Sequence, residues 1–177
     1  MTKTLLTLTF YITFIFNIMA ENNKINENTL LLELKYGIVE IELLPEVAPN
    51  HVARIKELVK DNFYDNIVFH RVIDGFMAQT GDPTGTGTGG SGQNIAAEFS
   101  GVPHKRGMLS MARASDPDSA DSQFFIVLED SSHLDNQYTI WGQVTKGMEF
   151  VDQIKKGNSY ANGMVNDPDK IISLKIK

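Results

Sequence analysis

The sequence reads FHRVIDGFMAQ from residue 69 to residue 79. Apolar and β-branched residues on both sides of Asp74-Gly75 predict two short strands, at residues 67–72 and 76–79. Further short strands are predicted at residues 95–99, 108–112, 124–128, 138–144 and 171–176. Many short strands joined by glycine-rich loops favour a mainly-β fold, either a closed barrel or a sandwich.

A hairpin and two helices accompany these strands. Apolar residues alternate with charged ones at period two, which predicts a hairpin with one face exposed to solvent. Its apolar positions are Leu30, Leu32, Leu34, Val39, Ile41 and Leu43. Pro49 suits a first helical position, and the apolar spacing after it predicts an amphipathic helix over residues 49–60. A second helix is predicted over residues 148–156, with Gly157 at its end. Two helices are enough to plug the open ends of a barrel.

The size and charge of the chain limit its function. With 177 residues and 42% apolar content, the chain can bury one core, and a single domain is expected. It carries 22 acidic and 16 basic residues and a net charge of -6, with no basic stripe to follow a phosphate backbone. Nucleic acid is therefore not expected as a partner, and the acidity is interpreted as a solubilising surface.

The first twenty residues are predicted to be a signal peptide. Lys3 is their only charge, an uncharged apolar stretch covers residues 5–19, and Ala20 offers a small residue for cleavage. Residues 21–28 form a polar segment, and the folded domain is expected to cover residues 29–177. The apolar stretch is short for a bilayer span of ~20 residues. Ile18 stands where cleavage prefers a small residue, so an uncleaved membrane anchor remains the alternative.

The predicted destination is a bacterial periplasm, by elimination. The chain has no cysteine, so it offers neither a disulfide framework nor a thiol nucleophile. It also has no Asn-x-Ser/Thr site, and its final residues SLKIK form no lumenal retention signal.

Three kinds of chemistry find little support in the sequence. None of the four histidines has a second soft ligand at metal-binding spacing, and His51 and His104 are expected on the surface; the other two are His70 and His133. The run GTGTGG at residues 85–90 matches a dinucleotide fingerprint formally, but no strand-to-helix context surrounds it, so a mobile surface loop is the simpler interpretation. Ser91 lacks the surroundings of a hydrolase nucleophile. No metal and no cofactor are expected.

Three segments together carry a family resemblance: residues 69–79, GMLSMARA at 107–114 and SQFFI at 122–126. In this order and spacing, followed by Leu134-Asp135 and Trp141-Gly142, the chain resembles the cyclophilin family over residues 29–177. The resemblance implies a closed eight-stranded antiparallel β-barrel capped by two α-helices. It also implies a shallow proline-binding face on the outside of the barrel and peptidyl-prolyl cis-trans isomerase activity.

The resemblance assigns roles residue by residue. Arg71 is similar to the catalytic arginine of the family. The apolar pocket that would hold the proline ring is implied at Phe76, Met77, Phe125 and Leu134, with Tyr138 at its rim. Contacts to the peptide backbone are implied at Gln79, Ala112, Arg113 and Gln123.

The residue types suit this chemistry independently. Rotation about a peptide bond meets a barrier of ~18–20 kcal/mol because the nitrogen lone pair is conjugated with the carbonyl. In the twisted state that nitrogen regains its lone pair, so a fixed guanidinium donates to it more strongly than in the planar state. Without the motifs, Arg71 would be read as a surface or ion-pair residue. Because neighbours on a strand face opposite sides, Phe124 is expected in the core and Phe125 in the outer pocket.

Three departures from the family pattern affect specificity. His133 stands where many members, including those most sensitive to cyclosporin, have a tryptophan, so weakened cyclosporin binding is expected with the isomerase activity kept. Tyr138 replaces a histidine, and Arg113 replaces an asparagine.

The expected function is isomerisation of Xaa-Pro bonds in proline-containing polypeptides, namely exported proteins as they fold, by a monomer. The alternative is a proline-peptide binding module or chaperone without significant turnover. Retention of Arg71 favours the enzyme.

Overall fold

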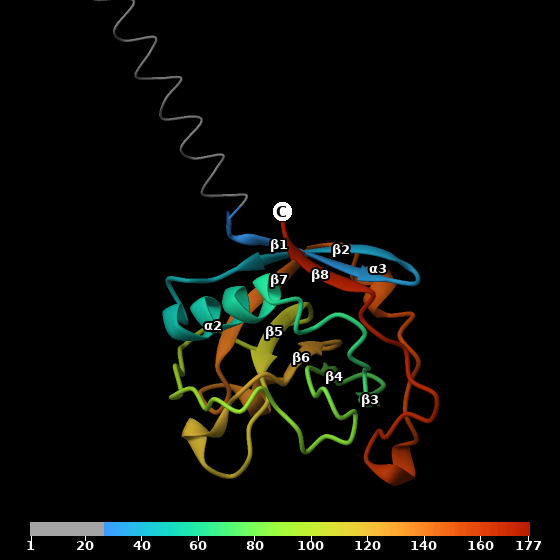
Figure 1. Cartoon of the computed structure of the whole chain (residues 1–177). Coiled ribbons are helices and arrows are strands. Elements are labelled where there is room, and N and C mark those ends of the chain that lie inside the picture. The colour runs from blue at the N-terminus through green and yellow to red at the C-terminus, as the bar shows by residue number, and fades with distance from the viewer. Residues whose placement is uncertain (1–26) are drawn as a thin grey trace, which may run out of the picture.

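The computed structural model describes residues 27–177, in which eight antiparallel strands form one curled sheet (Figure 1). The strand order is β3-β4-β6-β5-β7-β2-β1-β8. The strands are β1 (Thr29–Leu34), β2 (Gly37–Leu43), β3 (Arg71–Ile73), β4 (Met77–Thr80), β5 (Met108–Met111), β6 (Phe124–Val127), β7 (Ile140–Lys146) and β8 (Ser173–Ile176). The predicted signal peptide at residues 1–20, and most of the polar segment that follows it, lie outside the described residues.

The predicted hairpin is β1 paired with β2. Leu32 lies opposite Val39 in the register, and both side chains are fully buried. The alternating charged residues face outward, as the period-two pattern predicts.

The sheet curls into a half-barrel. The predicted eight-stranded antiparallel fold is therefore confirmed, but the barrel is less closed than predicted, because its two edge strands are joined only in part. The two edge strands, β3 and β8, share no continuous ladder. Isolated bridges, Val68 to Lys170 and Arg71 to Met164, connect the segments beside them instead. The chain before β8 cannot extend the ladder because Asp167 has a positive φ of 50° and Pro168 lacks a backbone N–H.

The first helix has the predicted bounds, and the second is shorter than predicted. Helix α2 (Pro49–Lys60) buries Val52, Ile55 and Val59. Helix α3 ends at residue 151 (Met148–Val151) instead of 156. After it the backbone N–H of Lys155 donates to Asp169, and that of Gly157 donates to the carbonyl of Val72. These bonds to other segments replace the next helical turn.

Two expectations near α2 are wrong for a common reason. His51 is fully buried instead of exposed, and its Nδ1 lies 2.6 Å from Glu98 Oε2. Residues 95–99 form no strand and keep a single bridge, Ile95 to Ala120. The Glu98 carboxylate accepts the backbone N–H groups of Asn50 and His51 and thereby caps α2, so residues near Glu98 pack against the helix instead of pairing in the sheet.

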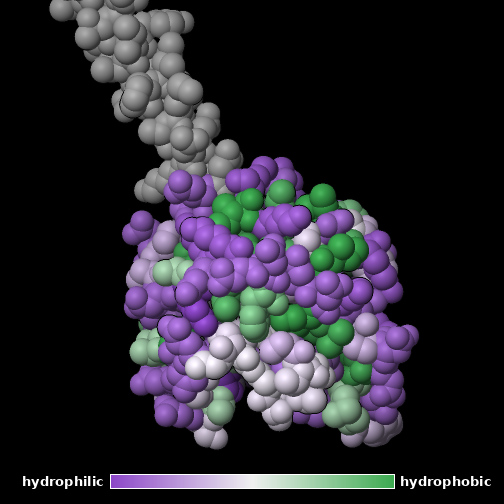
Figure 2. Space-filling model, in the orientation of Figure 1, coloured by the Kyte–Doolittle hydropathy of each residue, from purple (hydrophilic) through white to green (hydrophobic). Residues whose placement is uncertain are grey.

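No helix of residues 27–177 has the length and apolar character needed to span a bilayer. Figure 2 shows hydrophilic and apolar residues interleaved on one face of the molecule.

Apolar side chains gather on both sides of the sheet. The larger cluster fills the inside, and it includes Phe124, which is fully buried between Tyr64 and Trp141 with ring centroids 5.4 and 5.3 Å away. A second cluster, here called the outer cluster, contains Met77, Phe125, Val127 and Leu134. Adjacent residues of β6 thus face opposite sides, as predicted.

We expect Phe124→Ala to lower the free energy of unfolding by about 3–5 kcal/mol, because it leaves a cavity in the inner core. Phe125→Ala is the matched variant, since it removes the same ring from the shallower outer cluster. Urea denaturation of both variants measures the two costs. An equal or larger cost for Phe125→Ala would contradict the division into an inner core and an outer cluster.

Candidate functional site

The outer cluster brings together all the residues predicted to hold the proline ring. Met77 of β4, Phe125 of β6 and Leu134 of the 3₁₀ turn η2 (Ser132–Leu134) form its buried part. Half-buried Phe76 and Tyr138 pack against it, as does Ala112. The Tyr138 ring meets Phe125 edge-on, with centroids 5.7 Å apart.

A chain of polar side chains begins at Arg71 beside this cluster. Arg71 lies opposite Gln79 in the β3–β4 register, so both side chains point to the same face. Arg71 Nη1 donates to Gln79 Oε1 at 3.1 Å, and it lies 3.9 Å from Met77 Sδ. Gln79 Nε2 donates in turn to Gln123 Oε1 at 2.9 Å. The guanidinium is thus fixed at the edge of an apolar surface.

Burial lowers the pKa of Arg71 from its ordinary value. The starting value of an arginine is so high that the group still carries its charge at neutral pH. Partial removal from water strengthens the hydrogen bonds that a guanidinium donates.

The glycine-rich loop supports the far end of this polar chain. Gln123 Nε2 donates to the carbonyls of Gly87 at 3.1 Å and Gly89 at 2.8 Å. The loop is itself held by the buried carboxylate of Asp82, which accepts backbone N–H groups from Thr84, Thr86, Gly87 and Gly89. The run that resembles a phosphate-binding loop therefore binds a carboxylate of its own chain.

The predicted backbone-contact residues line a groove of about 530 Å³ next to the cluster, which includes Gln79, Ala112, Arg113 and Gln123. The Ala112 N–H donates to the Gln123 carbonyl at 2.9 Å, so these two lining residues of the groove are hydrogen-bonded to each other. The Arg113 guanidinium lies 4.8 Å from the centre of the Tyr138 ring. Two departures from the family pattern therefore contact each other, in a cation–π arrangement at the pocket rim.

The chain is similar to known proteins in sequence and in fold. The family model described as cyclophilin type peptidyl-prolyl cis-trans isomerase/CLD matches residues 29–176. The chain belongs to the cyclophilin-type peptidyl-prolyl cis-trans isomerases. Peptidyl-prolyl cis-trans isomerase B of Bacillus subtilis is 48% identical over 122 residues, which cover 68% of this chain and 85% of the relative. A Brucella suis protein with the name "Probable peptidyl-prolyl cis-trans isomerase" is 50% identical over 163 residues, which cover 85% of this chain and 83% of the relative.

Solved cyclophilins share the fold. A Cryptosporidium parvum cyclophilin, crystallised in the presence of the dipeptide Ala-Pro, superposes with a TM-score of 0.77 and 30% identity, over 84% of this chain and 98% of its own. A cyclophilin of Hirschia baltica gives a TM-score of 0.76 and 28% identity, over 85% and 74%.

Sequence reasoning missed His104 in this cyclophilin and placed it wrongly on the surface. His104 is 2% exposed and lies against the outer cluster, with its ring stacked 6.5 Å from that of Phe125. Its Nδ1 lies 2.9 Å from Asp135 Oδ1, next to Leu134, and its Nε2 lies 3.1 Å from Ser110 Oγ. Asp135 lies 31 residues away in the sequence, so the residues around His104 alone gave no sign of the burial.

Asn162 is the second residue that sequence reasoning missed. Its backbone carbonyl accepts from Arg71 Nε at 3.0 Å, and its side-chain Oδ1 accepts from Nη2 at 3.1 Å. An asparagine before a glycine was a signal for a turn, but nothing local linked that turn to Arg71.

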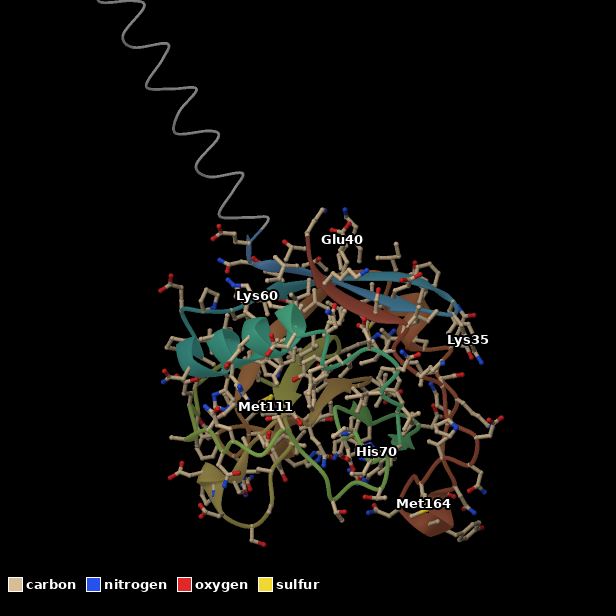
Figure 3. The ribbon with its side chains drawn as sticks, in the orientation of Figure 1. Lys35, Glu40, Lys60, His70, Met111 and Met164 are labelled. Carbon is tan, nitrogen blue, oxygen red and sulfur yellow. The ribbon has the colours of Figure 1, made fainter. Side chains whose placement is uncertain are left out.

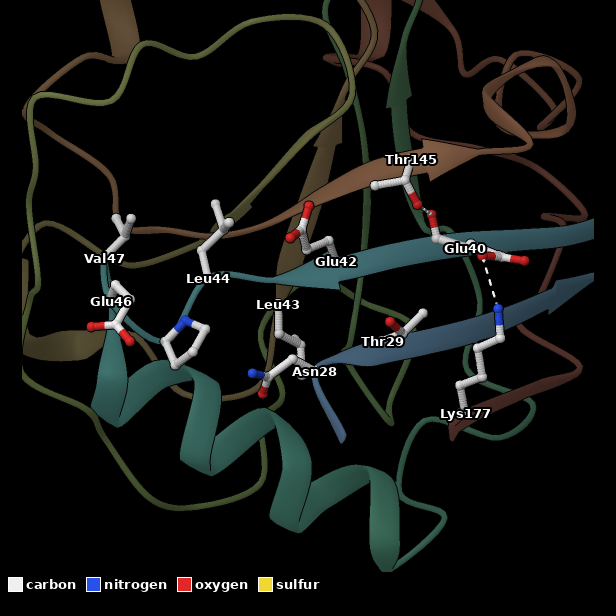
Figure 4. Close-up of a pocket in the computed structure, with 11 residues that line it drawn as sticks. Asn28, Thr29, Glu40, Glu42, Leu43, Leu44, Glu46, Val47, Thr145 and Lys177 are labelled. Atoms are coloured by element: carbon white, nitrogen blue, oxygen red, sulfur yellow. Dashed lines mark hydrogen bonds and ion pairs between the residues drawn. The ribbon is translucent and has the colours of Figure 1, made fainter. Parts of the chain in front are cut away.

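A second hollow contains none of the predicted site residues. It lies beside β2 and the start of α2, and Glu40, Glu42, Glu46 and Leu44 are among its lining residues (Figure 4). The Glu40 carboxylate already pairs with Lys177 at 3.2 Å. Among residues 27–177, no three histidine, cysteine, aspartate or glutamate side chains gather closely enough to hold a metal ion.

The Asp82 carboxylate predicts a pH dependence. Burial opposes its ionisation, but hydrogen bonds from Thr84, Gly89 and Gly87 outweigh that effect and lower its pKa from 3.8 to about 2. A pKa depressed on folding stabilises the protein above pH ~4, and this contribution is lost as pH falls towards 2. The shift corresponds to roughly 2 kcal/mol.

We therefore expect Asp82→Asn to lower the free energy of unfolding by about 2 kcal/mol at pH 7. The difference from the parent should shrink between pH 4 and pH 2, as parent Asp82 takes up its proton. Urea denaturation across this range measures it. A difference that stays constant down to pH 2 would mean that the ionised carboxylate does not hold the loop.

Proposed function

We propose that this isomerase acts on Xaa-Pro bonds of exported proteins as they fold, with Arg71 as the catalytic residue. The observation that carries the proposal is the fixed guanidinium beside the outer cluster, which is separate from the larger core cluster and has half-buried Phe76 and Tyr138 packed against it. The cluster offers an apolar surface on which a proline ring can pack. The groove beside it offers backbone and side-chain amide groups that can hydrogen-bond to the adjoining peptide.

The proposed mechanism follows from the arrangement. Apolar side chains hold the proline ring still, while the rest of the peptide lies along Gln79, Ala112 and Gln123. As the bond twists, the proline nitrogen loses conjugation and becomes a hydrogen-bond acceptor. Arg71 then donates to that nitrogen more strongly than it can in the planar state, which lowers the barrier. The reaction breaks no covalent bond, and these steps need no cofactor.

Proline-containing polypeptides are the proposed substrates. The Cryptosporidium parvum relative was crystallised in the presence of Ala-Pro, which supports proline recognition by this fold. The apolar surface of the outer cluster can accept the proline ring whichever residue precedes it. The positive charge of Arg113 at the rim is positioned to influence which neighbouring residues are preferred.

We expect residues 21–177 to accelerate cis-trans exchange of a short Xaa-Pro peptide, and Arg71→Ala to lower kcat/KM by roughly 10²–10³-fold, the scale of one lost transition-state donor. Phe124→Leu, a conservative change in the inner core, serves as the control for general destabilisation. A folded parent that binds the peptide without accelerating exchange would instead support a binding module or chaperone.

Export is part of the proposal and rests on the N-terminal sequence, with its apolar residues 5–19 and the small Ala20. We expect the mature protein, expressed with its full N-terminus in a bacterium, to be a periplasmic monomer that begins at residue 21. N-terminal sequencing of the fractionated protein tests the cleavage. An intact Met1 on membrane-bound material would favour the anchored alternative.

Weak cyclosporin binding is also proposed. The His133 ring lies 5.2 Å from Phe76, so it occupies the pocket edge, but it is smaller than an indole and exposes less apolar surface. We expect His133→Trp to increase cyclosporin affinity by about tenfold or more, the equivalent of one aromatic contact, with the isomerase rate little changed. Isothermal titration measures the affinity, and nanomolar binding by the parent would contradict the proposal.

A further inference from the structure

The loop at residues 157–164 is tied to the free edge of β3. The Val72 N–H donates to the Gly163 carbonyl at 2.8 Å, and the Gly157 N–H donates to the Val72 carbonyl at 2.9 Å. The two glycines approach so closely that a Cβ on Gly157 would collide with the backbone of Gly163. In Figure 3 this loop, marked by Met164, lies on the same side of the molecule as His70, the residue before Arg71. The loop therefore has a fixed position next to the arginine.

Within this loop the backbone aims Asn162 at Arg71. The 3₁₀ turn η3 (Ser159–Ala161) begins where the Asn158 side chain accepts the Tyr160 N–H. It ends at Asn162, whose φ of 52° is left-handed. Asparagine tolerates this conformation better than most residues. The turn thereby presents both the backbone carbonyl and the side-chain oxygen of Asn162 to one guanidinium.

These bonds account for most of the donors of Arg71. Of its five N–H groups, two donate to Asn162, one donates to Gln79, and one lies toward the weakly accepting sulfur of Met77. Nη2 keeps one N–H without a partner among residues 27–177. Because Asn162 and Gln79 hold the group at different nitrogens, rotation of the guanidinium would break at least one of these bonds.

We propose that Asn162 is a positioning residue that fixes the plane of the Arg71 guanidinium, so that the remaining Nη2 N–H meets the proline nitrogen. The inference rests on the proposed catalytic role of Arg71. The side chain of Asn162 is exposed, and its one hydrogen bond within residues 27–177 goes to Arg71. Removing that side chain therefore disturbs the arginine far more than the fold.

Asn162→Gly is the decisive variant, since glycine keeps the left-handed backbone and its carbonyl acceptor while losing Oδ1. We expect kcat to fall about tenfold, less than for Arg71→Ala because the bond from Nε remains. The affinity for a proline peptide should stay within twofold, because the apolar pocket is intact. Asn162→Asp keeps an acceptor oxygen and should restore kcat to within about threefold of the parent.

Asn66→Gly is the matched control. Asn66 also has a positive φ, of 66°, and its side-chain oxygen accepts from Lys170, away from the site. The Asn66→Gly variant should therefore leave kcat unchanged. The ¹⁵N–¹H signal of Arg71 Nε gives a readout that a merely structural role would not move. It should broaden or shift in Asn162→Gly and stay unchanged in Asn66→Gly.

The outcomes separate this inference from the proposed function. If Arg71→Ala loses activity while Asn162→Gly keeps full kcat, the positioning role is wrong and the catalytic role stands. If Asn162→Gly and Asn162→Asp lose equal activity, the acceptor oxygen is not the cause and the positioning role is again wrong. If Arg71→Ala keeps full activity, the proposed function fails and the positioning role fails with it.

Discussion

Alternation of side chains across one curled sheet governs both the fold and the site. Along β6, Phe124 points into the core and Phe125 points to the opposite side, so a single strand contributes to both the inner core and the outer cluster. The register carries this alternation across neighbouring strands, with Arg71 opposite Gln79 and Gln79 opposite Phe125. A slip of one residue would turn these side chains to the other face and bury the arginine in the core.

Polar support around the site keeps the guanidinium in place. On one side the buried Asp82 carboxylate shapes the glycine-rich loop, whose carbonyls orient Gln123, which orients Gln79. On the other side the loop along β3 supplies Asn162. In the proposed mechanism the guanidinium recognises a short-lived twisted state. Holding it in place before the substrate arrives means that no reorganisation is needed during the reaction.

The sequence predicted the elements with strong local patterns. The hairpin alternation, the helix that begins at Pro49 and the opposite facing of Phe124 and Phe125 agree with the structure. The family motifs also predicted which side chains would gather beside Arg71, because each motif lies on a strand or turn whose register places it there. Their catalytic and binding roles stay predictions.

The errors share a cause, which is that the deciding partner lies far away in the chain. The Nδ1 of buried His51 pairs with Glu98, and the Nδ1 of buried His104 pairs with Asp135. The second helix is shorter than predicted, and beyond it the N–H groups of Lys155 and Gly157 donate to Asp169 and Val72. No window of local sequence contains both members of such a pair.

We propose that the Arg71 guanidinium acts on the twisted bond and contributes little to holding the peptide. The most direct measurement is the cis-trans exchange rate of a proline peptide bound to the protein, followed by NMR for the parent and for Arg71→Lys, together with the peptide affinity. Lysine keeps the charge but lacks the planar fork of donors. For Arg71→Lys we expect an exchange rate lower by about 10²-fold, with an affinity within about threefold of the parent. An exchange rate close to that of the parent, or one that falls only as far as the affinity does, would contradict it.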